Sequence, residues 1–221
     1  TIMAAKKATV QVPTSLEEIT LDQYQRFLKA QEDNKDEDFL QLKSIEIFCS
    51  VPERDVKTIM AKDVKRISDK IANLFKGDHD LVKSFKLNGI DYGFIPEMDE
   101  MSFGEYIDLD TNISDWKTMF ISMSVLYRPI VHRSAGRYEV EEYSANTPER
   151  ALAFPMTAVL GSIFFLGSLG KDLFQITKNY LTEEAEKRQA QSVNLAKNLD
   201  GIVAYLDLVE ETFLNLKLSQ N

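Results

Sequence analysis

The sequence predicts a mainly α fold with a minor β component: a helical bundle around a central apolar helix, with two small β-hairpins. Three observations lead to this fold class. Several segments repeat apolar residues in steps of three and four, as one face of an amphipathic helix does. One segment of helical length carries no charge at all. Two short segments place a turn dipeptide between strand-like runs, which is typical of hairpins.

Two helix starts are marked by capping boxes. Thr20 and Gln23 have the required spacing at the start of a helix that should run to about Ala30, and Ser102 and Glu105 repeat it later in the chain. In such a box, each side chain bonds the backbone N–H of the other residue. Apolar spacing then predicts three more helices, over Phe39 to Cys49, Val56 to Phe75, and about Ser114 to Leu126.

The two hairpins are expected near residues 85–95 and 130–143. Asn88-Gly89 forms the turn of the first, and Ala135-Gly136 forms the turn of the second. Because an isolated two-stranded ribbon is barely stable in water, the hairpins either pair with each other or lie against the helices.

Residues 151–170 contain no charged side chain. A membrane span needs about 20 apolar residues in one helix, but Pro155 interrupts this stretch. From Pro155 to Gly170 the helix would measure roughly 24 Å, which is short of the hydrocarbon layer. A phosphate-binding loop is excluded as well, because Phe165 and Asp172 stand where its first glycine and its hydroxyl belong. We interpret the stretch as the central buried helix.

The two ends of the chain give different signals. Residues 1–13 are expected to form a flexible arm or a strand added to a neighbour, and residues 14–221 a single helical domain. Near the C-terminus an apolar stripe runs from Leu195 to Leu216 in alternating steps of four and three. Its helix either docks on the core of its own chain or packs between subunits, as a coiled-coil seam does.

Composition excludes several classes of function. A net charge of −9 argues against nucleic acid as a direct partner, since phosphates need a cationic face. The single cysteine, Cys49, rules out an internal disulfide. His79 and His132, the only histidines, lie far apart, and no zinc spacing, nucleophile elbow or dinucleotide fingerprint is present. We therefore predict no catalytic residue, no cofactor, no metal site and no enzymatic activity.

Tyrosine and arginine gather around the second hairpin and indicate a protein interface, because these residues often anchor such surfaces. The alternative is that the tyrosines pack the hairpin onto the core while the arginines neutralise neighbouring glutamates. Together with the C-terminal stripe, the candidate interface residues are Tyr127, Arg128, Arg133, Arg137, Tyr138, Tyr143, Leu206, Val209, Phe213 and Leu216.

Three stretches carry a family resemblance: "SLEEITLDQYQRFLKA…DFLQLKSIEIFCSV", "LYRPI…RYEVEEY" and "MTAVLGSIFFLGSLGKDL". In order and spacing they resemble structural and assembly proteins of tailed bacteriophages, the crAss-like phages among them, from about Ser15 to Leu181. The resemblance implies a non-enzymatic virion protein, either a ring or connector near the portal and tail or an internal cargo protein. A tail-assembly chaperone that does not stay in the virion is an alternative.

The same resemblance implies portal, tail or ring proteins as partners. It leaves open whether the chain also forms a homo-oligomer. It also implies a location in the virion, and in the host cytoplasm during assembly. A helical ligand-binding or enzymatic domain, with a pocket beside the central helix, is the alternative from another class.

Overall fold

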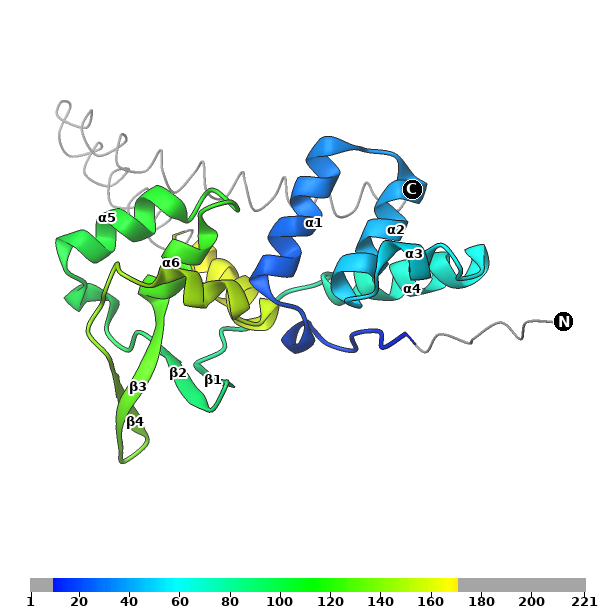
Figure 1. Ribbon diagram of the computed structural model, residues 1–221. Coiled ribbons are helices and arrows are strands. Elements are labelled where there is room, and N and C mark those ends of the chain that lie inside the picture. The colour runs from blue at the N-terminus through cyan, green and yellow to red at the C-terminus, as the bar shows by residue number, and fades with distance from the viewer. Residues whose placement is uncertain (1–9, 171–221) are drawn as a thin grey trace, which may run out of the picture. The chain divides into compact units, whose positions relative to one another are not determined.

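The computed structural model describes residues 10–170, which form two compact units (Figure 1). The first unit ends at Gly77, and the second begins at Asp78. Gly77 has a φ of 94°, in the left-handed region where glycine is the favoured residue after a helix. The expected single domain over residues 14–221 stays a prediction.

The first unit is helical. Its elements are the 3-10 helix η1 (Leu16–Glu18) and the α-helices α1 (Leu21–Asp33), α2 (Glu37–Phe48), α3 (Glu53–Val56) and α4 (Ala61–Leu74). Helix α2 packs against both α1 and α4. Aromatic rings fill part of this core: Tyr24 stacks on Phe75 with centroids 5.3 Å apart, and Phe48 lies 5.7 Å from the same ring.

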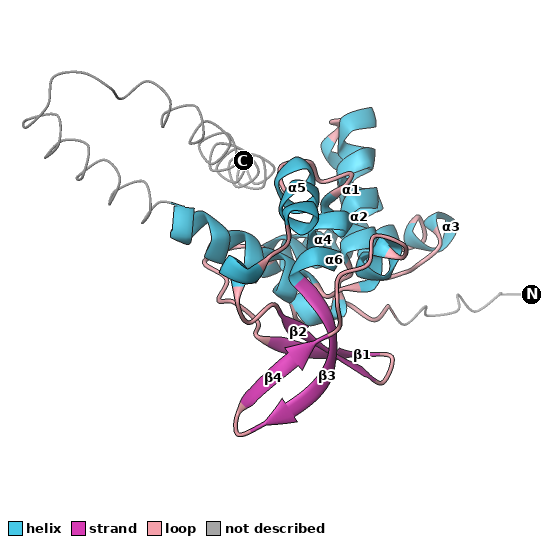
Figure 2. Ribbon diagram, turned by 90° about the vertical axis from the view of Figure 1, so that its left-hand side faces the viewer, coloured by secondary structure: helices cyan, strands magenta, loops and turns pink. Residues whose placement is uncertain are grey.

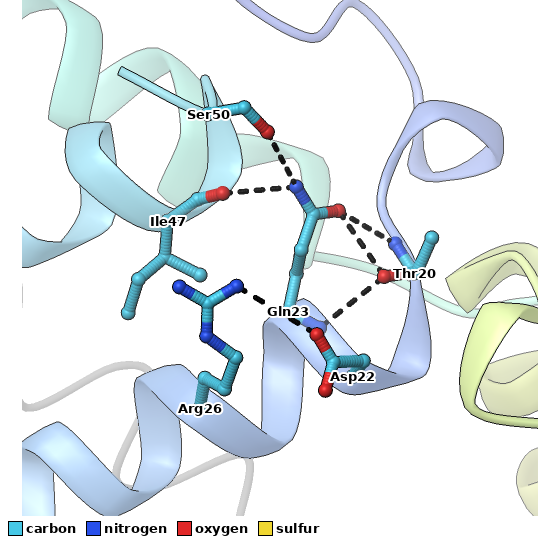
Figure 3. A network of polar contacts seen from close by, with 6 residues as sticks. All are labelled: Thr20, Asp22, Gln23, Arg26, Ile47 and Ser50. Carbon is cyan, nitrogen blue, oxygen red and sulfur yellow. Dashed lines mark hydrogen bonds and ion pairs between the residues drawn. The ribbon is translucent and has the colours of Figure 1, made fainter. Parts of the chain in front are cut away.

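The capping box at the start of α1 is confirmed (Figure 3). The Gln23 N–H donates to Thr20 Oγ1 at 3.2 Å, and the Thr20 N–H donates to Gln23 Oε1 at 2.9 Å. The Gln23 side chain also donates to the Ile47 carbonyl at 2.9 Å. One glutamine therefore caps α1 and ties it to the end of α2.

Two predicted helices begin later than expected. The chain turns after α3, and Met60 is extended, with ψ 138° and 65% of its surface exposed, so α4 begins at Ala61. The predicted helix from Ser114 begins at Met119, because Asp115 accepts the Lys117 N–H in a turn before it. Apolar spacing identifies a buried face, but it does not fix where the first helical turn lies.

The second unit combines helices with a sheet. Its elements are β1 (Ser84–Leu87), β2 (Ile90–Phe94), the 3-10 helix η2 (Met98–Glu100), α5 (Phe103–Asn112), α6 (Met119–Leu126), β3 (Tyr127–Ser134), β4 (Arg137–Val140), the 3-10 helix η3 (Pro148–Ala153) and a helix described over 156–170. Figure 2 shows the four strands together, with α6 running directly into β3.

Both predicted hairpin turns are confirmed. Asn88 and Gly89 have φ values of 51° and 83°, and Ala135 and Gly136 have values of 47° and 81°. Positive φ at both central residues is the requirement of a type I′ turn, whose twist suits a hairpin.

The predicted fold class is nevertheless wrong. Strand β2 pairs antiparallel with β3, Gly93 opposite Arg128, so the two hairpins form one four-stranded sheet in the order β1-β2-β3-β4. The fold is α+β and not a helical bundle carrying two small hairpins. Of the two arrangements left open for the hairpins, pairing with each other is found, and the sheet also contacts the central helix, where Phe94 of β2 lies 5.7 Å from Phe165 between ring centroids. Turn patterns are local, whereas the β2–β3 pairing joins segments far apart in the chain.

The central apolar helix begins after Pro155, and its first half is buried as predicted. Met156, Val159 and Ile163 are among the core residues, whereas Leu169 is exposed near the end of the described part. No helix within residues 10–170 is long and apolar enough to cross a membrane. The C-terminal stripe lies outside the described residues.

Candidate protein-binding groove

An open groove of about 1180 Å³ lies on the second unit. One wall is β4 with the chain that follows it, over residues 136–143, and the other is the chain from the end of β2 to the N-terminus of α5, over residues 94–105. Phe165, from the central apolar helix, reaches the groove as well. Segments far apart in the sequence therefore meet around one hollow, and the sheet pairing of β2, β3 and β4 holds them there.

Glutamates dominate the charge of the groove. Its acidic lining residues are Glu97, Glu100, Glu105, Glu139, Glu141 and Glu142, and its lysine and arginine residues are Lys83, Arg128 and Arg137. The neighbouring negative charge of Glu97 raises the pKa of Glu100 above its usual value. The walls therefore present an excess of negative charge, and a cationic segment would relieve it.

A largely buried ion pair braces the groove. Arg128 Nη2 lies 2.9 Å from Glu105 Oε1, and Arg128 Nη1 donates to the Glu141 carbonyl at 3.1 Å. The other oxygen of Glu105 accepts the Ser102 N–H at 2.7 Å, completing the capping box predicted for α5. Arg128 thus joins β3 both to α5 and to the segment after β4.

The pKa of Glu105 reflects this environment. Burial acts to raise it, but the hydrogen bonds from Ser102 and the positive charge of Arg128 outweigh burial and bring the pKa below its usual value. Glu105 is therefore held as a carboxylate, and its role in the structure is that of a brace.

Two tyrosines fix the walls. The Tyr138 hydroxyl donates to the carbonyls of Lys83 and Phe94, at 2.9 and 2.7 Å. The Tyr143 hydroxyl donates to Asp108 Oδ2 at 2.7 Å, and burial, reinforced by this carboxylate, raises the pKa of Tyr143 to about 12. Both hydroxyls are therefore engaged by acceptors within the second unit.

The structure brings four of the predicted interface residues together. Arg128, Arg137, Tyr138 and Tyr143 all line the groove. Arg133 is exposed on β3, with its guanidinium 5.7 Å from the Tyr138 ring centroid.

Tyr127 is different, because only 1% of its surface is exposed and its hydroxyl donates to the Val82 carbonyl at 2.7 Å. It packs in the core, as the alternative interpretation of the tyrosines expected, and it is not available to a partner. Leu206, Val209, Phe213 and Leu216 lie outside the described residues.

An exposed apolar strip on α5 was not predicted from the sequence. Phe103, Tyr106 and Ile107 are 77%, 53% and 44% exposed, and their spacing of three and four places them on one helix face. The strip begins one residue after Ser102, which lines the groove. The spacing was visible in the sequence, but it did not show that this face points to solvent.

Metal-ligating clusters and the single thiol are two features to consider within the described part of the chain. Within residues 10–170, no group of three or more His, Cys, Asp or Glu side chains is placed to hold a metal ion. Burial raises the pKa of Cys49 to about 11, so its thiol stays protonated and weakly nucleophilic at neutral pH. The groove and the strip supply charge and exposed aromatic surface.

Comparison of the chain with protein-family models, with curated proteins and with solved structures gives no match. The resemblance to phage proteins therefore stays a prediction.

Proposed function

We propose that this chain is a non-enzymatic structural or assembly protein that works through protein–protein contacts. Its binding surface is the groove together with the apolar strip on α5. The observation that carries the proposal is the strip itself, where three large apolar side chains lie exposed on a helix only ten residues long.

The physical reason is the cost of leaving such a face in water. Burying a large apolar side chain stabilises by about 1.5–3 kcal/mol, so a partner that covers Phe103 and Tyr106 gains several kcal/mol. Aromatic residues beside a polar rim are also the usual anchors of protein interfaces. The glutamates of the groove form such a rim, and they select partners that carry positive charge.

The resemblance to proteins of tailed bacteriophages supports a place in the virion or its assembly. A ring or connector near the portal and tail, or an internal cargo protein, remains in the particle. A tail-assembly chaperone meets the same partners and then leaves. Mass spectrometry of purified particles distinguishes these roles, because a ring, connector or cargo protein is found in the particle at stoichiometric amounts and a chaperone is not.

A second candidate, a domain that binds a small ligand, is favoured by one observation. The Nε atom of Arg128 is buried in the groove wall and has no hydrogen-bond partner among the described residues. A ligand with an acceptor atom would satisfy it. The groove is open rather than enclosed, however, and small-molecule sites generally surround most of their ligand.

The test combines the purified full-length chain with portal, ring and tail proteins from the same phage genome, and measures complex mass by light scattering. We expect a complex with at least one of them. Replacing Phe103 and Tyr106 together by serine should weaken it at least tenfold, which corresponds to about 1.4 kcal/mol. Met60→Ser, an equally exposed apolar residue on the other unit, is the control and should leave the affinity unchanged. A chain that binds none of these proteins contradicts the proposal.

A further inference from the structure

The first twelve residues have a chemistry opposite to that of the groove. They contain Lys6 and Lys7 and no acidic residue, in a chain whose net charge is −9. From Lys7 to Val12 polar and apolar residues alternate, which is the pattern of a β-strand with one polar face. Ile2 and Met3 add apolar side chains before the lysines.

The groove offers the features that such a segment requires. β4 is an edge strand in the order β1-β2-β3-β4, so no strand within residues 10–170 pairs with its outer side (Figure 2). Extended segments often bind by adding a strand to such an edge. The glutamates of the groove lie beside this edge: Glu139 on β4 and Glu141 and Glu142 just after it are exposed. None of the three forms an ion pair within residues 10–170.

We propose that residues 2–12 of a second copy of this chain bind in the groove as an added strand. Lys7 lies on the polar face of the added strand, toward the glutamates beside β4, and Lys6 precedes the alternating run. The apolar residues of that run lie on the opposite face and cover the strip that begins at Phe103. The inference rests on the proposed function and names one partner for its surface.

The chain is anchored directly after this segment. Pro13 is buried, and the Thr14 N–H donates to Glu18 Oε1 at 3.2 Å, which anchors the chain at that point. The twelve residues before Pro13 span about 40 Å when extended. Every residue that lines the groove belongs to the second unit, so any copy presents a complete site to the arm of another copy. Exchange of arms joins copies into a closed dimer or a ring.

Charge reversal tests the proposal with two variants of the full-length chain. The arm variant carries Lys6→Glu and Lys7→Glu, and the groove variant carries Glu139→Lys and Glu142→Lys; the two glutamates are exposed, so the fold should persist. The control variant, Lys62→Glu with Lys65→Glu, makes the same charge change as the arm variant on exposed positions of α4. Sedimentation velocity measures the self-association constant of each protein, and circular dichroism checks its folding.

We expect the wild-type chain and the control variant to self-associate, and the arm and groove variants each to do so at least tenfold more weakly. An equimolar mixture of the arm and groove variants should regain association. In that mixture the acidic arm meets the basic groove while the native arm meets the native groove. Added salt should weaken every complex, because the contacts are between exposed charges.

Three results would overturn the inference. The first is a wild-type chain that is monomeric at all concentrations, which includes the case in which the arm binds the groove of its own copy. The second is a mixture that does not recover association. The third is self-association that the groove variant leaves unchanged. If one of these results is found while the chain still binds a virion protein through Phe103, the proposed function survives and this inference fails; if the chain also binds no virion protein, both fail.

Discussion

Gly161 allows the most direct test of how the central apolar helix is packed. A Cβ atom built on Gly161 would overlap the carbonyl of Asp80 and come within 3.4 Å of Leu81 Cα. These obstacles are backbone atoms, which cannot rotate away as the end of a side chain can. Gly161→Ala therefore forces either the helix or the segment at residues 80–81 to move.

Two opposing effects set the size of the change. Alanine favours a helix interior over glycine by about 1 kcal/mol. Overpacking a close contact costs about 1–3 kcal/mol, and backbone obstacles place this site at the upper end of that range. The net expectation for Gly161→Ala is a loss of about 2 kcal/mol in the free energy of unfolding, from the difference of these terms.

Urea unfolding followed by tryptophan fluorescence measures this loss, because Trp116 is the only tryptophan and belongs to the second unit. The matched control is Gly104→Ala in α5, where an added Cβ meets nothing within 4 Å. There the helix preference acts alone, and the variant should be unchanged or more stable by up to about 1 kcal/mol. The reasoning is refuted if both variants change the unfolding free energy in the same direction, or if Gly161→Ala causes no loss.

Three further predictions concern the second unit. Glu105→Gln should cost about 3 kcal/mol at pH 7 by leaving Arg128 buried without its partner. Because the pKa of Glu105 is lowered in the folded state, the stability that its carboxylate contributes is complete above the unfolded pKa of 4.5 and is lost as the pH falls through the folded pKa. Urea titrations that show the same difference in unfolding free energy between wild type and Glu105→Gln from pH 7 to pH 3 would contradict this. Tyr127→Phe should cost about 1 kcal/mol, since the Val82 carbonyl loses its buried donor, and an unchanged thermal midpoint would count against that bond. Ala135→Asn should raise the thermal midpoint, because alanine at a φ of 47° is strained by about 1 kcal/mol and asparagine tolerates that conformation; a lower midpoint would show that the turn differs.

Local features of the fold were predictable from the sequence. Each capping box joins residues three apart, so Thr20 with Gln23 and Ser102 with Glu105 could be recognised without any knowledge of the rest of the chain. Asn88-Gly89 and its counterpart at residues 135–136 specify their turns through backbone preference alone. The same holds for the burial of the first half of the central helix, because a helix without charge has few alternatives.

Features that depend on distant parts of the chain were not predictable. The pairing of Gly93 with Arg128 decides the fold class, but the sequence around either residue does not indicate which strand it pairs with. The strip at Phe103 could be recognised as apolar, yet whether a helix face meets the core or the solvent depends on what packs around it. Tyr127 and Tyr138 were both predicted as interface residues, although the first is in the core and the second lines the groove.

We propose that the groove and the apolar strip on α5 form a protein-binding surface. Hydrogen–deuterium exchange of the full-length chain, dilute and then bound to a partner or to further copies, tests it most directly. Backbone amides of α5 and of residues 137–143 should exchange more slowly in the complex, while those of α4 keep their rates. Unchanged exchange in α5 and β4, with protection elsewhere, would contradict the account.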